Sequence, residues 1–351
     1  MESEFVFRDN GSNWHKWDLH CHTASSYDYK YKADDANELL VNDWINQKIN
    51  AVVITDHFKI DSKRIEELRY IIDKKKLNIT LFPGVELRTD KGATNIHVIL
   101  IFDNACDIKT LEEDFNVTML RGKAKPTSHT NENIYWDYND IVEFAKDHKA
   151  IISIHTGKKA NGMDEEISNS QQIGMAIKTE YAESVDIFEV SKLKDIEGYK
   201  KYVFNDIKAR PLVICSDNHD PRNYEIKENL WIKAKLNFEG LKQAVIHCDE
   251  RVYVGDCPSK IISVYENPER YIDEISVSKR SDAKNYDSWF NFTLQLNPGL
   301  TTIIGNKGSG KSALADLIGY IGGTDNYASF SFLSKDRFCK EDKKFNLDYT
   351  G

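Results

Sequence analysis

The sequence has no paired cysteines of the kind that cross-link small secreted domains or bind zinc. Its six cysteines are scattered, and no two of them form a C-x-x-C pair, so neither a disulfide scaffold nor a cysteine-ligated zinc site is indicated. No apolar run is long enough to cross a bilayer, and the opening MESEFVFRDN lacks the basic and apolar regions of a signal peptide. We therefore expect a cytoplasmic protein with no membrane partner.

Positive charge is also in deficit. The chain has 47 Lys and Arg against 56 Asp and Glu, which gives a formal net charge of -9. An acidic chain does not attract nucleic acid through its net charge, so such binding would need a local basic patch, or metal ions that offset the acid in one cleft. With 40% hydrophobic residues, the 351-residue chain has the composition of a globular protein of one large or two ordinary domains.

Between about residues 14 and 260, short apolar runs alternate with longer amphipathic stretches. Four of these stretches carry apolar residues at helical spacing: 34–48, 61–76, 138–149 and 195–210. Repeated alternation of strand and helix predicts an α/β fold, and seven runs favour a barrel of largely parallel strands over a short open sheet. The seven runs span residues 14–20, 51–57, 79–87, 96–102, 150–156, 184–190 and 211–217.

Two polar segments interrupt this alternation, and a third follows it. Residues 103–137 are expected to form an insertion or lid at the mouth of the site, and residues 156–180 form a second excursion after a strand. After about residue 262 the sequence becomes charged and weakly periodic, so a first domain over residues 1–262 and a linker over residues 263–289 are expected.

Six of the ten histidines, an isolated glutamate and an aspartate fall at the edges of the apolar runs. In a barrel of parallel strands the carboxyl ends converge on one rim, where the active sites of such barrels lie. Residues two apart on a strand share a face. His20 and His22 should therefore point the same way with Cys21 opposite, and Asp217 and His219 should share a face if the last strand stays extended. Imidazoles and carboxylates that meet at one point are ligands of zinc, iron or manganese. The residues are His20, His22, His57, Glu86, His97, His155, Asp217 and His219.

Seven short segments carry a family resemblance. DLHCHT, ITDH, PGVEL, IHVIL, ISIH, EVS and CSDNH resemble, in this order, the motifs of the polymerase and histidinol phosphatase (PHP) family. The resemblance covers about residues 14–262. It implies a distorted (β/α)7 barrel with two or three divalent metal ions, Mn, Zn or Fe, at its rim. The sequence departs from the family pattern at HTG, because the family often has proline after that histidine.

The resemblance also implies a ligand set. The first metal ion would be held by His20, His22, Glu86 and Asp217, the second by Glu86, His97 and His155, and the third by Asp28, His57 and His219. Asp28 stands where some members of the family have histidine and others aspartate. Asp18 and Asp56 would not bind a metal ion themselves but would orient the imidazoles that do. The expected catalytic groups are Asp56, His57, Glu86 and Asp217.

The chemistry follows from clustered divalent ions. Such ions lower the pKa of a bridging water, polarise a phosphoryl oxygen and stabilise the leaving oxygen, so we expect phosphoester hydrolysis by metal-activated hydroxide. No protein nucleophile is needed, and Cys21, Ser153 and Ser216 are interpreted as packing or strand residues. Lys158 and Lys159 either contact a phosphate or lie in a solvated loop, and Arg222 has the same two interpretations.

A glycine-rich stretch near the end of the chain, GNKGSGKS, fits the nucleotide-binding pattern G-x-x-x-x-G-K-[ST]. LTTII before it predicts a strand, and ALADLIGYI after it predicts a helix. Backbone N–H groups of such a loop wrap phosphates, while Lys311 would reach the β and γ phosphates and Ser312 a magnesium ion. The eight residues are Gly305, Asn306, Lys307, Gly308, Ser309, Gly310, Lys311 and Ser312.

The surrounding sequence resembles the opening of ABC- and SMC-type ATPases, so residues 290–351 are expected to be the N-terminal part of such a domain, apparently truncated. No apolar run ending in an acid follows the loop, so ATP with Mg is expected to bind, and to be hydrolysed, in the complete protein. A PHP barrel followed by such an ATPase resembles the TrlF-like group of bacterial proteins. This resemblance implies a nuclease coupled to an ATPase, in DNA repair or phage defence, and a homodimer through the ATPase domain.

The sequence leaves two alternatives open. A small-molecule phosphatase of the histidinol-phosphatase type is compatible with the complete ligand set, but it leaves the ATPase segment unexplained. A non-catalytic, nucleotide-sensing scaffold is disfavoured because all nine candidate ligand positions are occupied by metal-binding residue types.

Overall fold

The structure, a computed structural model, divides into two compact units, Met1–Ser263 and Val264–Gly351. Among the residues that it describes, no helix is long and apolar enough to cross a membrane. The described residues are 10–90, 96–123, 134–156, 181, 183–202, 204, 208–278, 291–324 and 327–334.

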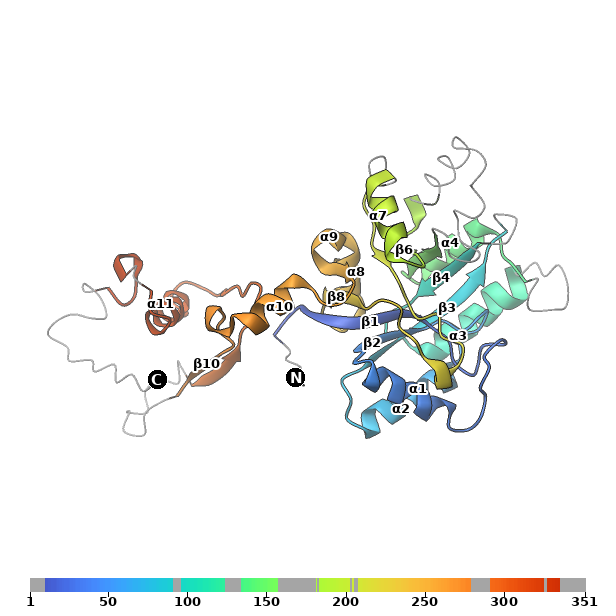
Figure 1. Cartoon of the computed structure of the whole chain (residues 1–351), viewed down its shortest axis with the longest axis horizontal. Helices are drawn as coiled ribbons and strands as arrows, with labels where there is room; N and C mark the ends of the chain where they lie inside the picture. Colours follow the sequence, from blue (N-terminus) through green and yellow to red (C-terminus); the bar gives the residue numbers. More distant parts are fainter. Residues whose placement is uncertain are drawn as a thin grey trace. The chain divides into compact units, whose positions relative to one another are not determined.

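A nine-stranded sheet with the order β7-β6-β5-β4-β3-β2-β1-β8-β9 forms the frame of the first unit (Figure 1). All seven expected strands are present, but β8 and β9 were not expected. The burial of β8 alternates along its sequence LWIKA, and this period-two pattern is the signal that could have revealed it. The strands are β1 (Asn13–Cys21), β2 (Ala51–Ile54), β3 (Thr80–Arg88), β4 (His97–Ile101), β5 (Ile151–His155), β6 (Ile187–Glu189), β7 (Leu212–Val213), β8 (Leu230–Ala234) and β9 (Val252–Val254).

The sheet closes on itself at the carboxyl end of β1. Cys21 forms a parallel bridge with Asn218, which follows β7. The Asp217 N–H donates to the His20 carbonyl at 2.9 Å, and the His22 N–H donates to the Asn218 carbonyl at 3.1 Å. Strands β1 to β7 therefore surround a barrel interior, while β8 and β9 extend the sheet from the amino-terminal half of β1. The expected α/β barrel is confirmed.

One strand runs against its neighbours. The pairs β1–β2, β2–β3, β5–β6 and β6–β7 are parallel, whereas β4 is antiparallel to both β3 and β5. This reversal places His97, the first residue of β4, opposite Arg88 at the carboxyl end of β3. A histidine that begins a strand therefore lies on the same rim as those that end strands.

Helices cover the outer face of the barrel. α1 and α2 lie side by side on one flank (Figure 1), and the side chain of Asp61 caps α2 by accepting the Arg64 N–H at 3.0 Å. Leu40 and Trp44 of α1 and Leu68 of α2 belong to an outer core between helices and sheet. A separate inner core takes side chains from each of the seven barrel strands. The described α-helices of the first unit are α1 (Ala36–Asn46), α2 (Ser62–Lys74), α3 (Ile108–Phe115), α4 (Tyr138–Asp147), α7 (Leu193–Tyr202), α8 (Phe238–Ile246) and α9 (Cys248–Arg251). A further helix, α10 (Ser259–Glu266), has no buried residue and crosses the boundary between the two units.

A β-bulge in β1 decides which side chains face the barrel mouth. Asp18 pairs with Val52 and Cys21 with Ile54, so three steps along β1 match two steps along β2. Leu19 belongs to the inner core, whereas Cys21, two residues later, belongs to the outer core. The extra residue therefore reverses the alternation of the strand, and the histidines on either side of Cys21 point into the mouth.

The polar segment 103–137 does not behave as a lid in its described parts. Ile108, Leu111 and Phe115 of α3 lie on one helical face and pack into the outer core. Trp136 is also fully buried. Its indole N–H donates at 3.1 Å to the carbonyl of Met119, in the π-helix Asn116–Lys123 that follows α3. The lid prediction is wrong here because these side chains bury apolar surface. Residues 124–133 and most of the second excursion, 157–180, lie outside the described residues.

The second unit contains a two-stranded antiparallel sheet of β10 (Glu274–Val277) and β11 (Phe292–Gln295), and the helix α11 (Lys311–Ile321). The helix predicted after the glycine loop is present. The strand predicted at residues 300–304 is not, and Leu300 and Ile304 are 83% and 85% exposed. The physical reason is that none of the described strands lies beside this segment to pair with its backbone.

Candidate metal centre

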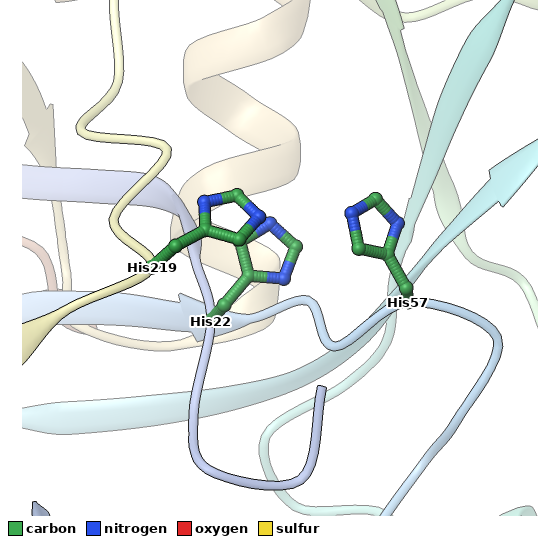
Figure 2. A group of neighbouring side chains, drawn as sticks. All are labelled: His22, His57 and His219. Atoms are coloured by element: carbon green, nitrogen blue, oxygen red, sulfur yellow. The ribbon is translucent and has the colours of Figure 1, made fainter. Parts of the chain in front are cut away.

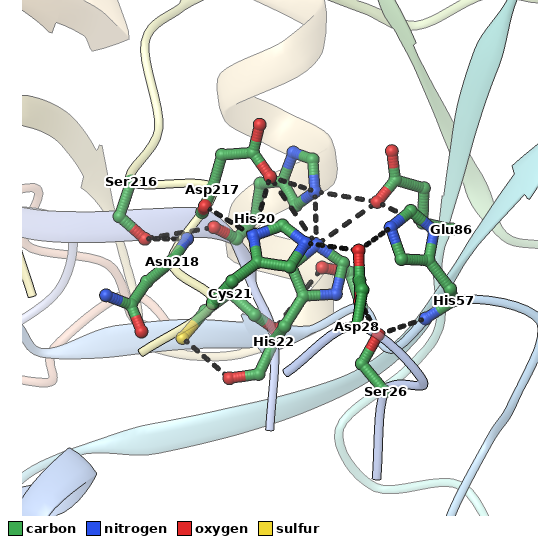
Figure 3. A network of polar contacts seen from close by, with 12 residues as sticks. His20, Cys21, His22, Ser26, Asp28, His57, Glu86, Ser216, Asp217 and Asn218 are labelled. Carbon is green, nitrogen blue, oxygen red and sulfur yellow. Dashed lines mark hydrogen bonds and ion pairs between the residues drawn. The ribbon is translucent and has the colours of Figure 1, made fainter. Parts of the chain in front are cut away.

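Six imidazoles and three carboxylates converge at the mouth of the barrel, and Figure 3 labels His20, His22, Asp28, His57, Glu86 and Asp217 among them. They come from strand ends and from the loops that follow them, and most are buried. The structure brings together all nine predicted ligands: His20 and His22 at the end of β1, Asp28 in the next loop, His57 after β2, Glu86 in β3, His97 at the start of β4, His155 at the end of β5, and Asp217 and His219 after β7.

Glu86 lies at the centre of this group. Its Oε2 atom is 3.0 Å from His20 Nε2, 3.1 Å from His22 Nε2 and 3.4 Å from His57 Nδ1. The side chain is only 1% exposed. A buried carboxylate that faces several imidazoles from one oxygen has the geometry needed to contribute to more than one metal ion.

The donor set around His20 fits a metal ion. Its Nδ1 faces the carboxylate of Glu189 at 3.0 Å, and since a carboxylate only accepts hydrogen bonds, a neutral, metal-bound His20 would carry its proton on Nδ1 and keep the lone pair of Nε2. That Nε2 lies 3.0 Å from Glu86 Oε2, 3.0 Å from His22 Nε2 and 3.3 Å from Asp217 Oδ1. Electron-rich atoms this close need a proton or a cation between them, and two imidazoles with two carboxylates suit a divalent transition metal.

A second group shares Glu86 and adds His97 and His155. The other carboxylate oxygen of Glu86, Oε1, lies 2.5 Å from His97 Nδ1 and 3.6 Å from His155 Nε2. Arg88 Nε lies 3.2 Å from His97 Nε2 and fixes the orientation of that ring. Glu86 therefore joins the first and second groups, one through each of its oxygens.

The third group gathers His22, His57 and His219 (Figure 2). Asp28 stands between two of these rings, with Oδ2 3.3 Å from His57 Nε2 and 3.1 Å from His219 Nε2. Nδ1 of His219 lies 2.9 Å from the Asp217 carbonyl, so a neutral, metal-bound His219 would donate from Nδ1 and keep the lone pair of Nε2, which faces Asp28. The donor set of Asp28, His57 and His219 therefore also fits a cation.

The chain after β7 does not stay extended, as the shared-face prediction for Asp217 and His219 required. Asp217 has a φ of 51°, a left-handed conformation that aspartate adopts more readily than most residues with a Cβ. The turn still brings Asp217 Oδ1 within 3.6 Å of His219 Nδ1. The two side chains meet at the site because the backbone turns, and strand alternation is not the cause.

Glu189 is a site residue that the sequence analysis missed. It ends β6 and is 1% exposed, and its Oε2 lies 3.0 Å from His20 Nδ1 and 3.6 Å from His155 Nε2. These three residues form a further group with metal-binding geometry. The available signal was an acid at the end of an apolar run, as for Glu86.

Asp18 and Asp56 hold the backbone around the site. Their hydrogen bonds in the described part of the chain do not include the predicted ones to imidazole rings. Asp56 accepts the Thr23 N–H at 2.6 Å and the Thr23 hydroxyl at 2.7 Å. Asp18 accepts the Ser216 N–H at 3.0 Å, the Ser216 hydroxyl at 2.6 Å and the Tyr224 hydroxyl at 2.6 Å. Because each carboxylate bonds to the segment next to a predicted ligand, each fixes the path of the chain there.

Opposite charges set the ionisation of the centre. Burial opposes the ionisation of Glu86, but the neighbouring imidazoles, His20 first among them, hold its pKa well below the ordinary value. Burial likewise opposes protonation of His22, yet hydrogen bonds to Asp217 and Glu86 raise its pKa to about 9. Protonated imidazoles thus balance the buried carboxylates, and a divalent ion that displaced those protons would take over this role.

Other candidate residues lie away from the centre or outside the described residues. The thiol of Cys21 is buried in the outer core, and Ser153 is buried in β5. Arg222 is exposed and held in an ion pair with Asp220 at 2.8 Å, which favours the solvated-loop interpretation. Lys158 and Lys159 lie outside the described residues.

The glycine loop leads into α11. Gly308 and Gly310 have φ values of 85° and 89°, which glycine adopts without strain. A Cβ at Gly305 would lie 2.6 Å from the Ser309 hydroxyl. The ammonium group of Lys311 folds back on the loop and donates to the carbonyls of Gly305 at 2.7 Å and of Asn306 at 2.8 Å. The loop is therefore compact, with its lysine directed toward its own backbone.

Comparison with known proteins gives only distant likenesses. No protein-family model and no curated protein matches the chain. Solved structures similar to it include a candidate metal-dependent phosphoesterase from Bifidobacterium adolescentis (13% identity, TM-score 0.42, 66% of this chain and 96% of that one). An amidohydrolase from Chromobacterium violaceum is similar at 12% identity and a TM-score of 0.39, over 59% of this chain and 88% of that one. PsfC from Pseudomonas syringae is similar at 13% identity and a TM-score of 0.38, over 64% of this chain and 83% of that one.

Proposed function

We propose that residues 1–262 form a PHP-type, metal-dependent phosphoesterase. The observation that carries this proposal is the convergence of six imidazoles with Asp28, Glu86 and Asp217 at one end of a barrel. Divalent metals bound there would lower the pKa of a bound water and polarise a phosphoryl oxygen.

The residues around the centre would position its parts. Glu86 joins the first and second groups, and Glu189 and Asp28 each hold imidazoles in place. His57 and Glu86 are buried, whereas the Asp217 side chain is 36% exposed. Asp217 is therefore one of the ligands that a substrate would meet from the solvent side, and we propose it with His57 and Glu86 as the catalytic set. Asp56 would act indirectly, by holding the turn after His22 through Thr23.

We further propose that the substrate is a nucleic acid. The support is a cavity of about 470 Å³ beside Asp217 and His219, which is open to solvent and accommodates a nucleotide. The resemblance to barrel–ATPase fusions points the same way. Residues 290–351 would bind ATP with Mg through the glycine loop when the ATPase domain is complete, and would couple nucleotide binding to cleavage.

The test is a substrate panel with added manganese. We expect cleavage of a labelled oligonucleotide that His20→Ala and Asp217→Ala abolish, while an exposed histidine variant, His247→Ala, keeps full activity. Release of phosphate from small monoesters with no cut in oligonucleotides would identify a small-molecule phosphatase. Protein that contains no Mn, Fe or Zn after metal-supplemented preparation would contradict both enzymatic functions.

A further inference from the structure

The cavity beside the metal centre is lined by two lysines that no sequence motif pointed to. Lys30 and Lys227 line it together with three predicted ligands, Asp28, Asp217 and His219. Both lysine side chains are exposed. In the described part of the chain, neither ammonium group forms a hydrogen bond or an ion pair, so both are available to an anion in the cavity.

The backbone fixes both lysines relative to the metal centre. The Lys30 N–H donates to the carbonyl of His219 at 2.9 Å, and Lys30 follows Asp28 by two residues. Lys227 follows Tyr224, whose hydroxyl donates to the buried Asp18 carboxylate at 2.6 Å. The two ammonium groups are therefore carried by segments anchored to the barrel, although their side chains remain free to adjust.

Bound metal ions would change the net charge of the cavity lining from negative to positive. Asp220 is paired with Arg222, and Asp28 and Asp217 would be compensated by the ions that they ligate. The charges of the lining that remain are then the negative charge of Glu225 and the positive charges of the two lysines. A metal-loaded cavity would thus carry positive charge beyond that of the ions, although the whole chain is acidic.

We propose that Lys30 and Lys227 bind the phosphate next to the scissile one in a nucleic-acid strand. This inference rests on the proposed function and deepens it. The scissile phosphate would lie at the metal groups, and the cavity is much larger than one phosphate, so it accommodates the neighbouring nucleotide. The lysines make this cavity a groove that selects a polymeric phosphodiester over an isolated phosphoester.

The first test compares two diesters in the presence of manganese: a single-stranded oligonucleotide and bis(p-nitrophenyl) phosphate, which has no second phosphate. The variants are Lys30→Gln, Lys227→Gln and the double variant, with Lys146→Gln, exposed on α4, as the matched control. We expect the double variant to lower the ratio of kcat/KM for the oligonucleotide to that for the small diester by about tenfold, through KM. Each lysine should also account for about 0.7 of the slope of log Kobs against log salt.

A binding measurement gives a second readout that does not need turnover. Fluorescence anisotropy of the labelled oligonucleotide, measured in a Glu86→Gln background, should show the same loss of affinity for the lysine variants but not for Lys146→Gln. Equal losses of kcat/KM on both diesters would overturn the proposal, because the lysines would then contact the scissile phosphate or stabilise the fold. Unchanged oligonucleotide binding and KM would overturn it as well.

The same experiment separates this inference from the proposed function. If the unmodified protein hydrolyses the small diester but neither binds nor cuts the oligonucleotide, the polymer assignment is wrong and the hydrolase assignment stands. If it hydrolyses neither diester, the proposed function fails, and the anisotropy series alone decides whether the lysines bind a phosphate chain.

Discussion

Glu189 Oε2 lies 3.0 Å from Nδ1 of His20, and both side chains are buried. The contact joins the end of β6 to the end of β1 across the barrel mouth. In a neutral His20 the contact would favour the proton on Nδ1, which leaves Nε2 available to a metal ion.

Replacing Glu189 by glutamine should weaken metal binding while keeping the fold. Glutamine has the same shape but a neutral, weaker hydrogen-bond acceptor, so we expect metal affinity to fall by about 10- to 100-fold, measured by competition with a chelating dye. Glu183→Gln, an exposed position near the same strand, is the control. Equal affinities for the two variants would show that Glu189 does not orient His20.

Asp28→Asn should remove one metal ion and leave the others. The Asp28 carboxylate contacts His57 and His219 but none of the other predicted ligands in the contacts described above. We expect elemental analysis to show about one ion fewer per chain. Asp34→Asn, exposed in the same loop, should keep the full complement. A loss of every ion from Asp28→Asn would mean that the three groups do not bind independently.

Cys21→Ala should cost stability without changing metal content. The thiol is fully buried in the outer core, so truncation leaves a small cavity and should lower the free energy of unfolding by about 1–2 kcal/mol. Denaturant unfolding measures the loss, and metal analysis of the folded variant checks the site. A fall in bound metal would place the thiol at the mouth of the barrel and would contradict the bulge in β1.

His15 should make the protein sensitive to mild acid. Burial lowers the pKa of His15 to about 4 from 6.5, against a hydrogen bond with Asn50 that raises it. The unfolded chain therefore binds more protons between these values. The contribution of the neutral, buried His15 to the free energy of unfolding is complete above about pH 6.5. About 3 kcal/mol of it is lost as the pH falls to 4. His15→Gln should flatten the fall of unfolding free energy between pH 6.5 and 4, whereas the exposed His247→Gln should follow the unmodified protein.

Lys311→Ala should weaken nucleotide binding by protein that carries the whole of the proposed ATPase domain. The Lys311 ammonium group occupies the loop that would cradle the phosphates, whereas Lys307 in the same loop has an exposed side chain. We expect ATP affinity to fall by more than about tenfold for Lys311→Ala, because a charge-assisted contact to phosphate is lost, and to change less for Lys307→Ala. Calorimetric titration measures both, and similar affinities would contradict the phosphate-binding role of Lys311.

Much of the site could be predicted because metal ligands are rare residue types that fall at the edges of apolar runs. His57 and His155 illustrate this, since each follows a run of buried β-branched residues. Glu189 was missed because an acid at a strand end does not reveal which imidazole it will face. Lys30 and Lys227 were missed because exposed lysines have no periodicity, and only their position on the cavity distinguishes them.

The sequence by itself determined the strand–helix alternation, eight of the nine candidate ligands and their order, because apolar spacing and residue chemistry are local properties. Asp28 entered the set only through the family resemblance. The tertiary structure alone decided where those ligands point. The bulge between Asp18 and Cys21 turns His20 and His22 inward, the reversal of β4 brings His97 to the common rim, and the left-handed backbone at Asp217 returns the chain to the mouth. Each of these depends on pairing with a strand or segment distant in sequence, which no local pattern records.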